Sequence, residues 1–421
     1  MFIEKIKRVF SNLTFQVLFA ITAGIIVGIM FPSQAIDCKV ISDTFFKVVK
    51  MLIPLIVFFS VVNGIGSIGS LKKLGSLGAK SLLYFEIVTT LALVIGLILA
   101  NVIEPGKGVD FSAVTTGGTA QLSAASTDSF KWSEFIQHLI PGNAVKAFAE
   151  GDVVQVLIFA ILFGMGLTMM EKEGELLITV FDKILHVLFN ILSMLMKFAP
   201  IAAFAAMAFA IGQFGLKSLI PMGKVMLTFY GTAFLFITFI LGSIAWYTGF
   251  NIFKFIVYIK DELLIVLGTC SSETVLNRIM KKLENAGCKS SLVRFVVPTG
   301  YSFNLDGSTI YLSVGCIFLA QAYQVPLSWE QQVTIIFILM FTSKGAAAVH
   351  GSAIVILAST LSAMKIIPVE GVAILFGVDR FMSEVRATTN LIGNGVATLF
   401  IAKTEKELDV EQMKKVINGE G

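Results

Sequence analysis

Hydrophobic segments long enough to cross a lipid bilayer alternate along the chain with short polar connections. A helix needs about 20 residues to cross the hydrocarbon core. Because backbone groups in lipid must satisfy their own hydrogen bonds, such segments predict helices. We therefore expect an all-α polytopic membrane protein. The predicted continuous spans are Thr14–Phe31, Phe46–Ile68, Leu82–Ile103, Val153–Met170, Phe181–Ile211 and Ile220–Tyr247.

The second half of the chain is also hydrophobic, but small and polar residues interrupt its segments. A single interruption is compatible with a kink in a packed helix. Their succession favours two re-entrant hairpins, each followed by a helix, because irregular backbone at membrane depth is tolerated only where it is buried or lines water. Such segments point to a transporter's midplane binding site. The interruptions are Gly268–Thr274 in Leu263–Ile279, Asn304–Ser308 in Val297–Ala322, and Thr342–Ser352 in Val333–Leu361.

The last long segment, Gly377–Lys403, carries polar residues at intervals of 4, 3, 4 and 4, which places them on one helix face. An arginine at mid-span costs roughly 3 kcal/mol or more unless it faces the protein interior, water or an anion. One interpretation is a structural ion pair of Arg386 with Asp379 or Asp306. We favour the interpretation that this face lines a solute path and that the planar Arg386 guanidinium hydrogen-bonds to both oxygens of a substrate carboxylate. The polar residues are Asp379, Ser383, Arg386, Asn390 and Asn394.

Composition supports a membrane protein. Of the 421 residues, 56% are hydrophobic and 14% are charged, whereas a soluble domain has about 25% charged residues. Positive charge gathers in Leu71–Lys80 and Lys403–Lys415, so the positive-inside rule places these segments and both termini in the cytoplasm. The longest polar stretch, Glu104–Asp152, is expected outside. The sequence shows no nucleophile–base pair, metal-ligand cluster or nucleotide loop, so we expect neither an enzyme nor a cofactor.

Motifs in the interrupted half are more specific. They are Ser271-Ser272 with Thr274, Asn304-Leu-Asp-Gly, Thr342-Ser-Lys-Gly-Ala-Ala, and Asp379 with Arg386 and Asn390. In these motifs the sequence resembles the dicarboxylate/amino acid:cation symporter family, which includes the glutamate transporters. The resemblance implies eight transmembrane helices plus two re-entrant hairpins, inverted repeats, and an elevator fold in a homotrimer. It implies scaffold elements at about 12–70 and 136–212, and transport-domain elements at about 80–104 and 220–404.

Within the family, Gly300–Gly307 and the run Asp379-Arg-Phe-Met-Ser-Glu are most similar to the bacterial four-carbon dicarboxylate transporters. In the amino-acid branch an aspartate usually stands at the position of Ser383 and pairs with the substrate ammonium. Serine carries no charge, and an ammonium buried without a counter-ion is strongly unfavourable. By resemblance, the substrate-binding residues are Arg386, Asn390, Ser383, Ser271, Ser272, Ala348 and Gly351.

The resemblance also implies positions for a coupling cation. Asn394 stands where sodium-coupled amino-acid members have an aspartate ligand, so coupling to Na⁺, to H⁺ or to both stays open. In the second hairpin, Ala348, His350 and Ala353 replace the more usual Gly, Pro and Gly. We interpret His350 as a plain tip residue rather than a proton carrier. The implied cation ligands are Asn304, Asp306, Asn390, Asn394, Thr89 and Ser343.

Together, these patterns predict a secondary active symporter that imports succinate, fumarate or malate with Na⁺ or H⁺. The alternative is an acidic or neutral amino acid:cation symporter of the same fold. A dedicated anion channel is disfavoured, because it would need no substrate-binding arginine beside cation ligands. We expect a multi-pass protein of the cell (inner) membrane. Its expected partners are the dicarboxylate, the bilayer and further copies of itself, with no nucleic acid.

Overall fold

The computed structural model describes residues 13–72, 76–108, 140–150, 153–170, 172–216, 219–345, 352–364, 367 and 369–418. Within these residues the regular structure is entirely helical, apart from an isolated antiparallel bridge between Cys288 and Leu408. The all-α class is thus confirmed. The number of spans, the two re-entrant hairpins, the inverted repeats and the elevator arrangement stay predictions. Four of the described helices are long and apolar enough to cross a membrane, namely Ser76–Ile103, Glu173–Met196, Leu219–Thr248 and Ser290–Ala322.

The N-terminal part differs from expectation at one predicted span. Phe46–Ile68 is not one helix, because a turn at residues 51–52 divides it. Pro54 explains the division, since proline has no N–H to donate and is tolerated in the first turn of a helix but not in its interior. The helices are α2 (Leu13–Met30), α3 (Pro32–Asp37), α4 (Lys39–Lys50), α5 (Ile53–Lys72) and α6 (Ser76–Ile103).

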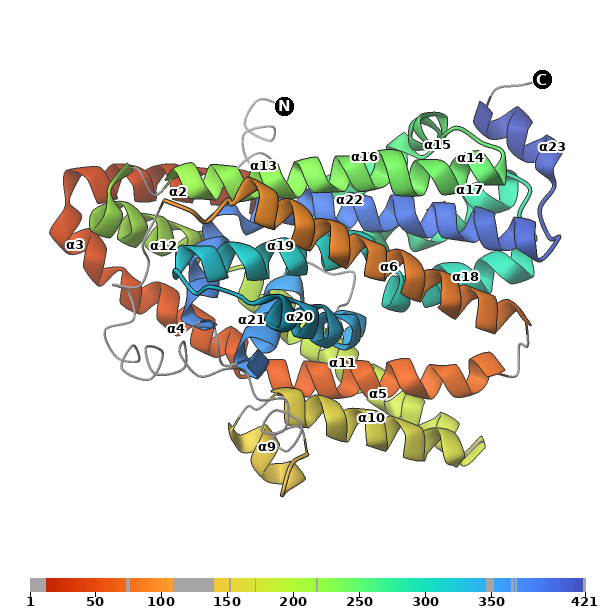
Figure 1. Cartoon of the computed structure of the whole chain (residues 1–421), viewed down its shortest axis with the longest axis horizontal. Coiled ribbons are helices and arrows are strands. Elements are labelled where there is room, and N and C mark those ends of the chain that lie inside the picture. The colour runs from red at the N-terminus through yellow and green to blue at the C-terminus, as the bar shows by residue number, and fades with distance from the viewer. Residues whose placement is uncertain are drawn as a thin grey trace, which may run out of the picture.

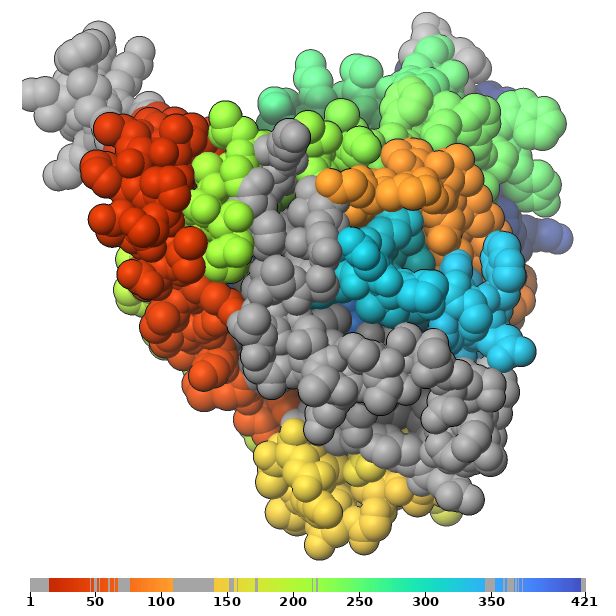
Figure 2. All heavy atoms as spheres, turned by 60° about the vertical axis from the view of Figure 1, so that its left-hand side comes forward, coloured from red at the N-terminus to blue at the C-terminus, as the bar shows by residue number. Residues whose placement is uncertain are grey.

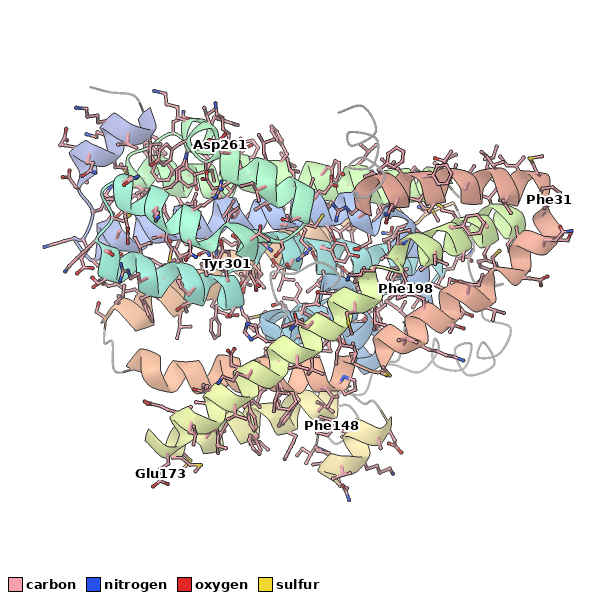
Figure 3. The ribbon with its side chains drawn as sticks, turned by 180° about the vertical axis from the view of Figure 1, so that it is seen from behind. Phe31, Phe148, Glu173, Phe198, Asp261 and Tyr301 are labelled. Atoms are coloured by element: carbon pink, nitrogen blue, oxygen red, sulfur yellow. The ribbon has the colours of Figure 1, made fainter. Side chains whose placement is uncertain are left out.

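The same physics divides the predicted span Phe181–Ile211. The helix stops before Phe198, at the junction in Figure 3, and a new helix begins with Pro200 in its first turn. Lys172 begins the next helix, whose first turn holds Glu173. An acid in that position is favoured by the helix dipole. These helices are α9 (Ala144–Glu150), α10 (Val153–Met169), α11 (Lys172–Met196) and α12 (Ala199–Phe214).

The predicted span Ile220–Tyr247 is present as one continuous helical stretch, and the first interrupted segment is divided at the expected place, between Thr269 and Leu276. Of the polar stretch Glu104–Asp152, residues 109–139 and 151–152 lie outside the described residues. The elements are α13 (Leu219–Leu235), π-helical η3 (Phe236–Leu241), α14 (Gly242–Thr248), α15 (Ile252–Tyr258), α16 (Lys260–Thr269), η4 (Ser272–Val275) and α17 (Leu276–Asn285).

The remaining elements follow the predicted interruptions. The helix before Asn304 ends there, and a new helix begins at Asp306. A capping box of Ser328 and Gln331 begins the second hairpin. The elements are α18 (Ser290–Phe303), α19 (Asp306–Ala322), α20 (Trp329–Thr342), η5 (Ser343–Gly345), α21 (Ser352–Met364), η6 (Val369–Gly371), α22 (Val372–Thr404), α23 (Val410–Met413) and η7 (Lys414–Asn418).

The long helix α22 organises the packing of the C-terminal half. It contacts α12, α13, α16, α18 and α19 (Figure 1). Helices α5, α10 and α11 pack together along the lower side of Figure 1, and α2 packs against α12 at the left. Figure 2 shows α6 beside α20 on the right, while the N-terminal helices lie at the left edge of this view. Nearly all of α19 is buried in this arrangement, so the break before it lies deep in the protein.

Candidate functional site

The polar face of α22 is buried against the broken helix and the first hairpin. All five of its predicted polar residues are almost fully covered. Glycines allow this close approach: a Cβ at Gly300 would collide with the Asn394 side chain, and one at Gly393 would collide with the Asp306 carboxylate. The spacing pattern therefore correctly predicted which face of the helix turns inward.

Arg386 is fully buried, and its guanidinium reaches two neighbouring elements. Nη1 donates to the Ser308 hydroxyl at 3.2 Å, and Nη2 donates to the Cys270 carbonyl at 3.4 Å. Cys270 has the left-handed φ of 53° at the tip of the first hairpin. Arg386 thus connects α22, the start of α19 and the hairpin tip through a hydroxyl and a carbonyl.

The Asp379 carboxylate interacts electrostatically with Arg386, and it accepts hydrogen bonds from two hydroxyls. Tyr311 on α19 donates to Asp379 Oδ1 at 2.8 Å. Ser383 donates from one turn along α22, with its Oγ 3.4 Å from both carboxylate oxygens. The hydroxyl of Ser383, the residue that sequence reasoning assigned to substrate choice, is therefore directed at Asp379.

Asn390 completes the start of α19. Its side-chain oxygen accepts from the backbone N–H groups of Gly307 at 2.8 Å and Ser308 at 3.2 Å, and its Nδ2 donates to the Ser308 hydroxyl at 3.2 Å. The N-cap residue of α19, Leu305, offers no side-chain acceptor. The first N–H groups of a helix have no partner within the helix, so Asn390 acts as a cap supplied by another helix.

The first hairpin brings its serines to the same region. Ser271 is extended and nearly buried, and Ser272 is fully buried with an Oγ that has no hydrogen-bond partner among the described residues. The Ser272 carbonyl accepts from Tyr301 on α18, the residue labelled in Figure 3, at a distance of 2.9 Å. Thr274 and Thr269 both donate to the Ser271 carbonyl, which fixes the turn. The Ser272 hydroxyl is thus available to a bound solute.

Three of the predicted cation ligands present unused oxygens at the break between α18 and α19. Within the described part of the chain, Oδ1 of Asn304, of Asp306 and of Asn394 are buried without a hydrogen-bond donor. Their other atoms are occupied: Asn304 donates to Asp306 Oδ2 at 3.3 Å, and Asn394 donates to the Val297 carbonyl at 3.0 Å. Buried polar atoms normally have partners. Carboxylate and amide oxygens of this kind fit a hard cation such as Na⁺, or a proton on Asp306.

Two more of the predicted cation ligands, Thr89 and Ser343, have different surroundings. Thr89 on α6 accepts a hydrogen bond from Lys344 of η5 at 2.9 Å. Ser343 is buried and donates to the Met340 carbonyl at 3.3 Å. Ala348, His350 and Gly351 lie outside the described residues, so the predictions about the second hairpin tip stay predictions.

Comparison with known proteins decides the family. Residues 13–404 match the model of the sodium:dicarboxylate symporter family. The chain belongs to this family. A C4-dicarboxylate transport protein of Bacillus subtilis is 51% identical over 416 residues, which cover 97% of this chain and 99% of the relative. Proteins of the same description from Citrifermentans bemidjiense (50% identical, covering 99% of this chain and 95% of the relative) and Yersinia pestis (48%, 97% and 96%) are similar.

Membership of the sodium:dicarboxylate symporter family makes this chain a membrane transporter and not an enzyme, as the sequence predicted. Three residues of the site were not singled out from the sequence. Tyr311 gave no signal, because it is an aromatic residue in an apolar helix. Ser308 was named only as the last residue of the interruption Asn304–Ser308. Lys344 could have been found, because an ionisable residue inside a membrane segment is functional by default.

Proposed function

We propose that this symporter-family protein imports four-carbon dicarboxylates such as succinate, fumarate and malate, driven by the flow of Na⁺ or H⁺ into the cell. The observation that carries the proposal is the fully buried Arg386 guanidinium, which donates to the Ser308 hydroxyl and to the Cys270 carbonyl at the hairpin tip. A guanidinium buried this deeply favours an anionic substrate group beside it. A carboxylate matches the planar fork of arginine with two parallel hydrogen bonds.

The second carboxylate of the substrate would meet neutral donors. The Ser272 hydroxyl is free of hydrogen bonds among the described residues, and Ser271 lies beside it in the hairpin tip. On α22, Asn390 has its Nδ2 directed at Ser308, next to Arg386. We assign these residues, together with Ala348 and Gly351, to the dicarboxylate. The names of the bacterial relatives support this substrate class.

Ser383 supports a dicarboxylate over an amino acid. Its hydroxyl hydrogen points to Asp379, and it brings no negative charge of its own to the substrate. The Asp379 carboxylate is engaged by Tyr311. A substrate ammonium would therefore find a hydroxyl lone pair and no free carboxylate, which leaves its desolvation uncompensated.

The unused oxygens of Asn304, Asp306 and Asn394 support coupling to a cation that travels with the substrate. Asp306 brings the only carboxylate of this set, because Asn394 is neutral. A proton on Asp306 and a Na⁺ ion among the three oxygens are both compatible with these ligands, so the coupling ion must be measured.

For the assembly, we propose the arrangement that the family resemblance implies. A scaffold of about residues 12–70 and 136–212 would form a homotrimer in the cell (inner) membrane, and about 80–104 and 220–404 would move. Both termini would face the cytoplasm. The packing of α22 against α13, α16, α18 and α19 supports a compact moving part.

The deciding experiment is uptake of labelled succinate into proteoliposomes, with Na⁺ and H⁺ gradients imposed separately. We expect concentrative uptake with at least one gradient, and competition by fumarate and malate. Liposomes with the Arg386→Lys protein serve as the matched control, because lysine keeps the positive charge but cannot form two parallel hydrogen bonds to one carboxylate. Uptake of L-aspartate in preference to succinate would replace this proposal with the amino-acid alternative. Succinate flux that no gradient can concentrate would indicate a channel.

A further inference from the structure

Lys344 lies in η5, directly after α20, and oxygen atoms of other elements surround its ammonium group. Nζ is 2.9 Å from the Thr89 hydroxyl on α6 and 3.2 Å from the carbonyl oxygen of Phe303 on α18. Oε2 of Glu86, also on α6, is 3.2 Å away. An ammonium has three N–H donors, so these three oxygens use its full capacity.

The oxygens around Lys344 are of the types that bind hard cations: a hydroxyl, a main-chain carbonyl and a carboxylate. The Thr89 hydroxyl gives its own hydrogen to the Phe85 carbonyl at 2.7 Å, so it presents a lone pair to Nζ. The carbonyl of Phe303 belongs to the last residue of α18, where helix carbonyls lack a partner within the helix. The ammonium therefore lies where the family resemblance places a free cation.

The ammonium supplies positive charge beside two carboxylates, those of Glu86 and Asp306. The Lys344 side chain is only 15% exposed, whereas that of Glu86 is 45% exposed. Lys344 also interacts electrostatically with the buried carboxylate of Asp306. A free cation bound to the same oxygens would be repelled by the ammonium at close range, in a region with little water to screen it.

We propose that the Lys344 ammonium is a tethered cation that fills the position formed by Thr89 and the Phe303 carbonyl, so that this protein binds no free cation there. Coupling cations are then confined to the oxygens of Asn304, Asp306 and Asn394. The inference rests on the proposed function only in treating the break between α18 and α19 as a cation site. If Thr89 also bound a free cation, one more coupling ion would be expected. The proposal therefore lowers the expected number of coupling ions by one.

The test counts ²²Na⁺ ions bound per chain in purified protein, without dicarboxylate, at an ionic strength held constant with choline chloride. We expect Lys344→Met to bind one more Na⁺ than the wild type, because Glu86 and Asp306 lose their internal counter-ion. Lys344→Arg, which keeps the charge, should bind the wild-type number. Lys183→Met, which removes an exposed lysine of α11, is the matched control and should also leave the number unchanged.

A second variant, Thr89→Val, tests where the added ion binds. Measured in the wild-type background, it also tests the proposal if Lys344→Met fails to fold. Thr89→Val keeps the side-chain shape and removes the hydroxyl. In the Lys344→Met background it should abolish the gained Na⁺, and in the wild type it should leave the count unchanged. The proposal is overturned by a folded Lys344→Met protein with the wild-type count, or by loss of a Na⁺ ion from Thr89→Val alone. Failure of succinate transport would refute the proposed function but would not alter these counts.

Discussion

The side-chain oxygen of Asn390 on α22 accepts the backbone N–H of Gly307 on α19 at 2.8 Å. This bond joins residues 83 positions apart and makes one helix the cap of another. It also sets the register between them, so that Arg386, one turn before Asn390, reaches the Ser308 hydroxyl. The position of the proposed carboxylate-binding group therefore depends on a break in a different helix.

Replacement of Asn390 separates this structural role from substrate binding. We expect Asn390→Ala to destabilise the protein by about 1–3 kcal/mol, because two buried N–H groups lose their acceptor. Asn390→Asp keeps an acceptor oxygen and should retain most of the stability, but its charge beside Arg386 should weaken succinate binding. Thermal unfolding in detergent and succinate uptake measure the two effects. An unchanged Tm for Asn390→Ala would show that the cap is dispensable.

Arg386→Lys tests the guanidinium fork. Lysine keeps the charge but cannot form two parallel hydrogen bonds to one carboxylate. We expect succinate transport to fall at least about tenfold, or roughly 1.4 kcal/mol, in a protein that remains folded. The measurement is KM for succinate, with the elution profile and Tm as controls for folding. Near-normal affinity would assign Arg386 to structure instead.

Much of this site could be predicted from the sequence, because a membrane helix must hide its polar face. The helical period alone placed Asp379 and Arg386 on one inward face. The divisions at Pro54 and Phe198 were missed, since hydrophobicity continues through them while the backbone hydrogen bonding does not.

The partners of the site residues could not be predicted in the same way. Thr89 was assigned to a cation by resemblance, whereas the structure shows the Lys344 ammonium 2.9 Å from its hydroxyl, across a separation of 255 residues. No local pattern encodes such a contact. It follows from how α6 and the second hairpin pack.

Asp306→Asn tests coupling. The carboxylate of Asp306 is fully buried, and its Oδ1 has no donor among the described residues, so it can take a cation or a proton. The amide keeps the shape and removes the charge, and we expect it to abolish gradient-driven accumulation of succinate. Exchange of external for internal succinate, which needs no net coupling, is the control that shows the carrier still binds substrate. Undiminished concentrative uptake would exclude this role for Asp306.

Glu405 offers a prediction outside the membrane-spanning helices. Hydrogen bonds from Lys80, at 2.5 Å, and from Ser76 lower the pKa of its carboxyl below the ordinary value, and they tie the start of α6 to the end of α22. Because the folded pKa is lowered, the stabilisation is present above the ordinary carboxyl pKa of about 4.3 and is lost as pH falls through the folded pKa. We expect Glu405→Gln to cost no more than about 1 kcal/mol at pH 7. The difference from wild type should disappear in unfolding measurements at lower pH, and a difference that grows there would contradict this sign.

Ser383→Asp tests the choice between a dicarboxylate and an amino acid. Succinate brings two negative charges to Arg386 and neutral donors, whereas L-aspartate adds an ammonium that the Ser383 hydroxyl cannot neutralise. The wild type should therefore prefer succinate to L-aspartate by at least roughly 100-fold, or about 2.7 kcal/mol. A carboxylate at position 383 should narrow this preference from both sides, by repelling the dicarboxylate and attracting the ammonium. Competition of unlabelled L-aspartate against labelled succinate uptake measures the change.

In this structure Ser383→Asp also carries an energetic cost that is unrelated to the choice of substrate. A control variant must separate the two effects. Ser383 Oγ lies 3.4 Å from both oxygens of Asp379, so a second carboxylate there would face a like charge in a buried place. Ser383→Asn has nearly the same volume as the aspartate variant and no charge, and it should keep the wild-type preference even if it lowers stability. A narrowed preference in the asparagine variant would assign the effect to shape rather than charge. If L-aspartate competes as well as fumarate in the wild type, the dicarboxylate assignment is wrong, because a neutral residue at position 383 would then suffice to accommodate an ammonium.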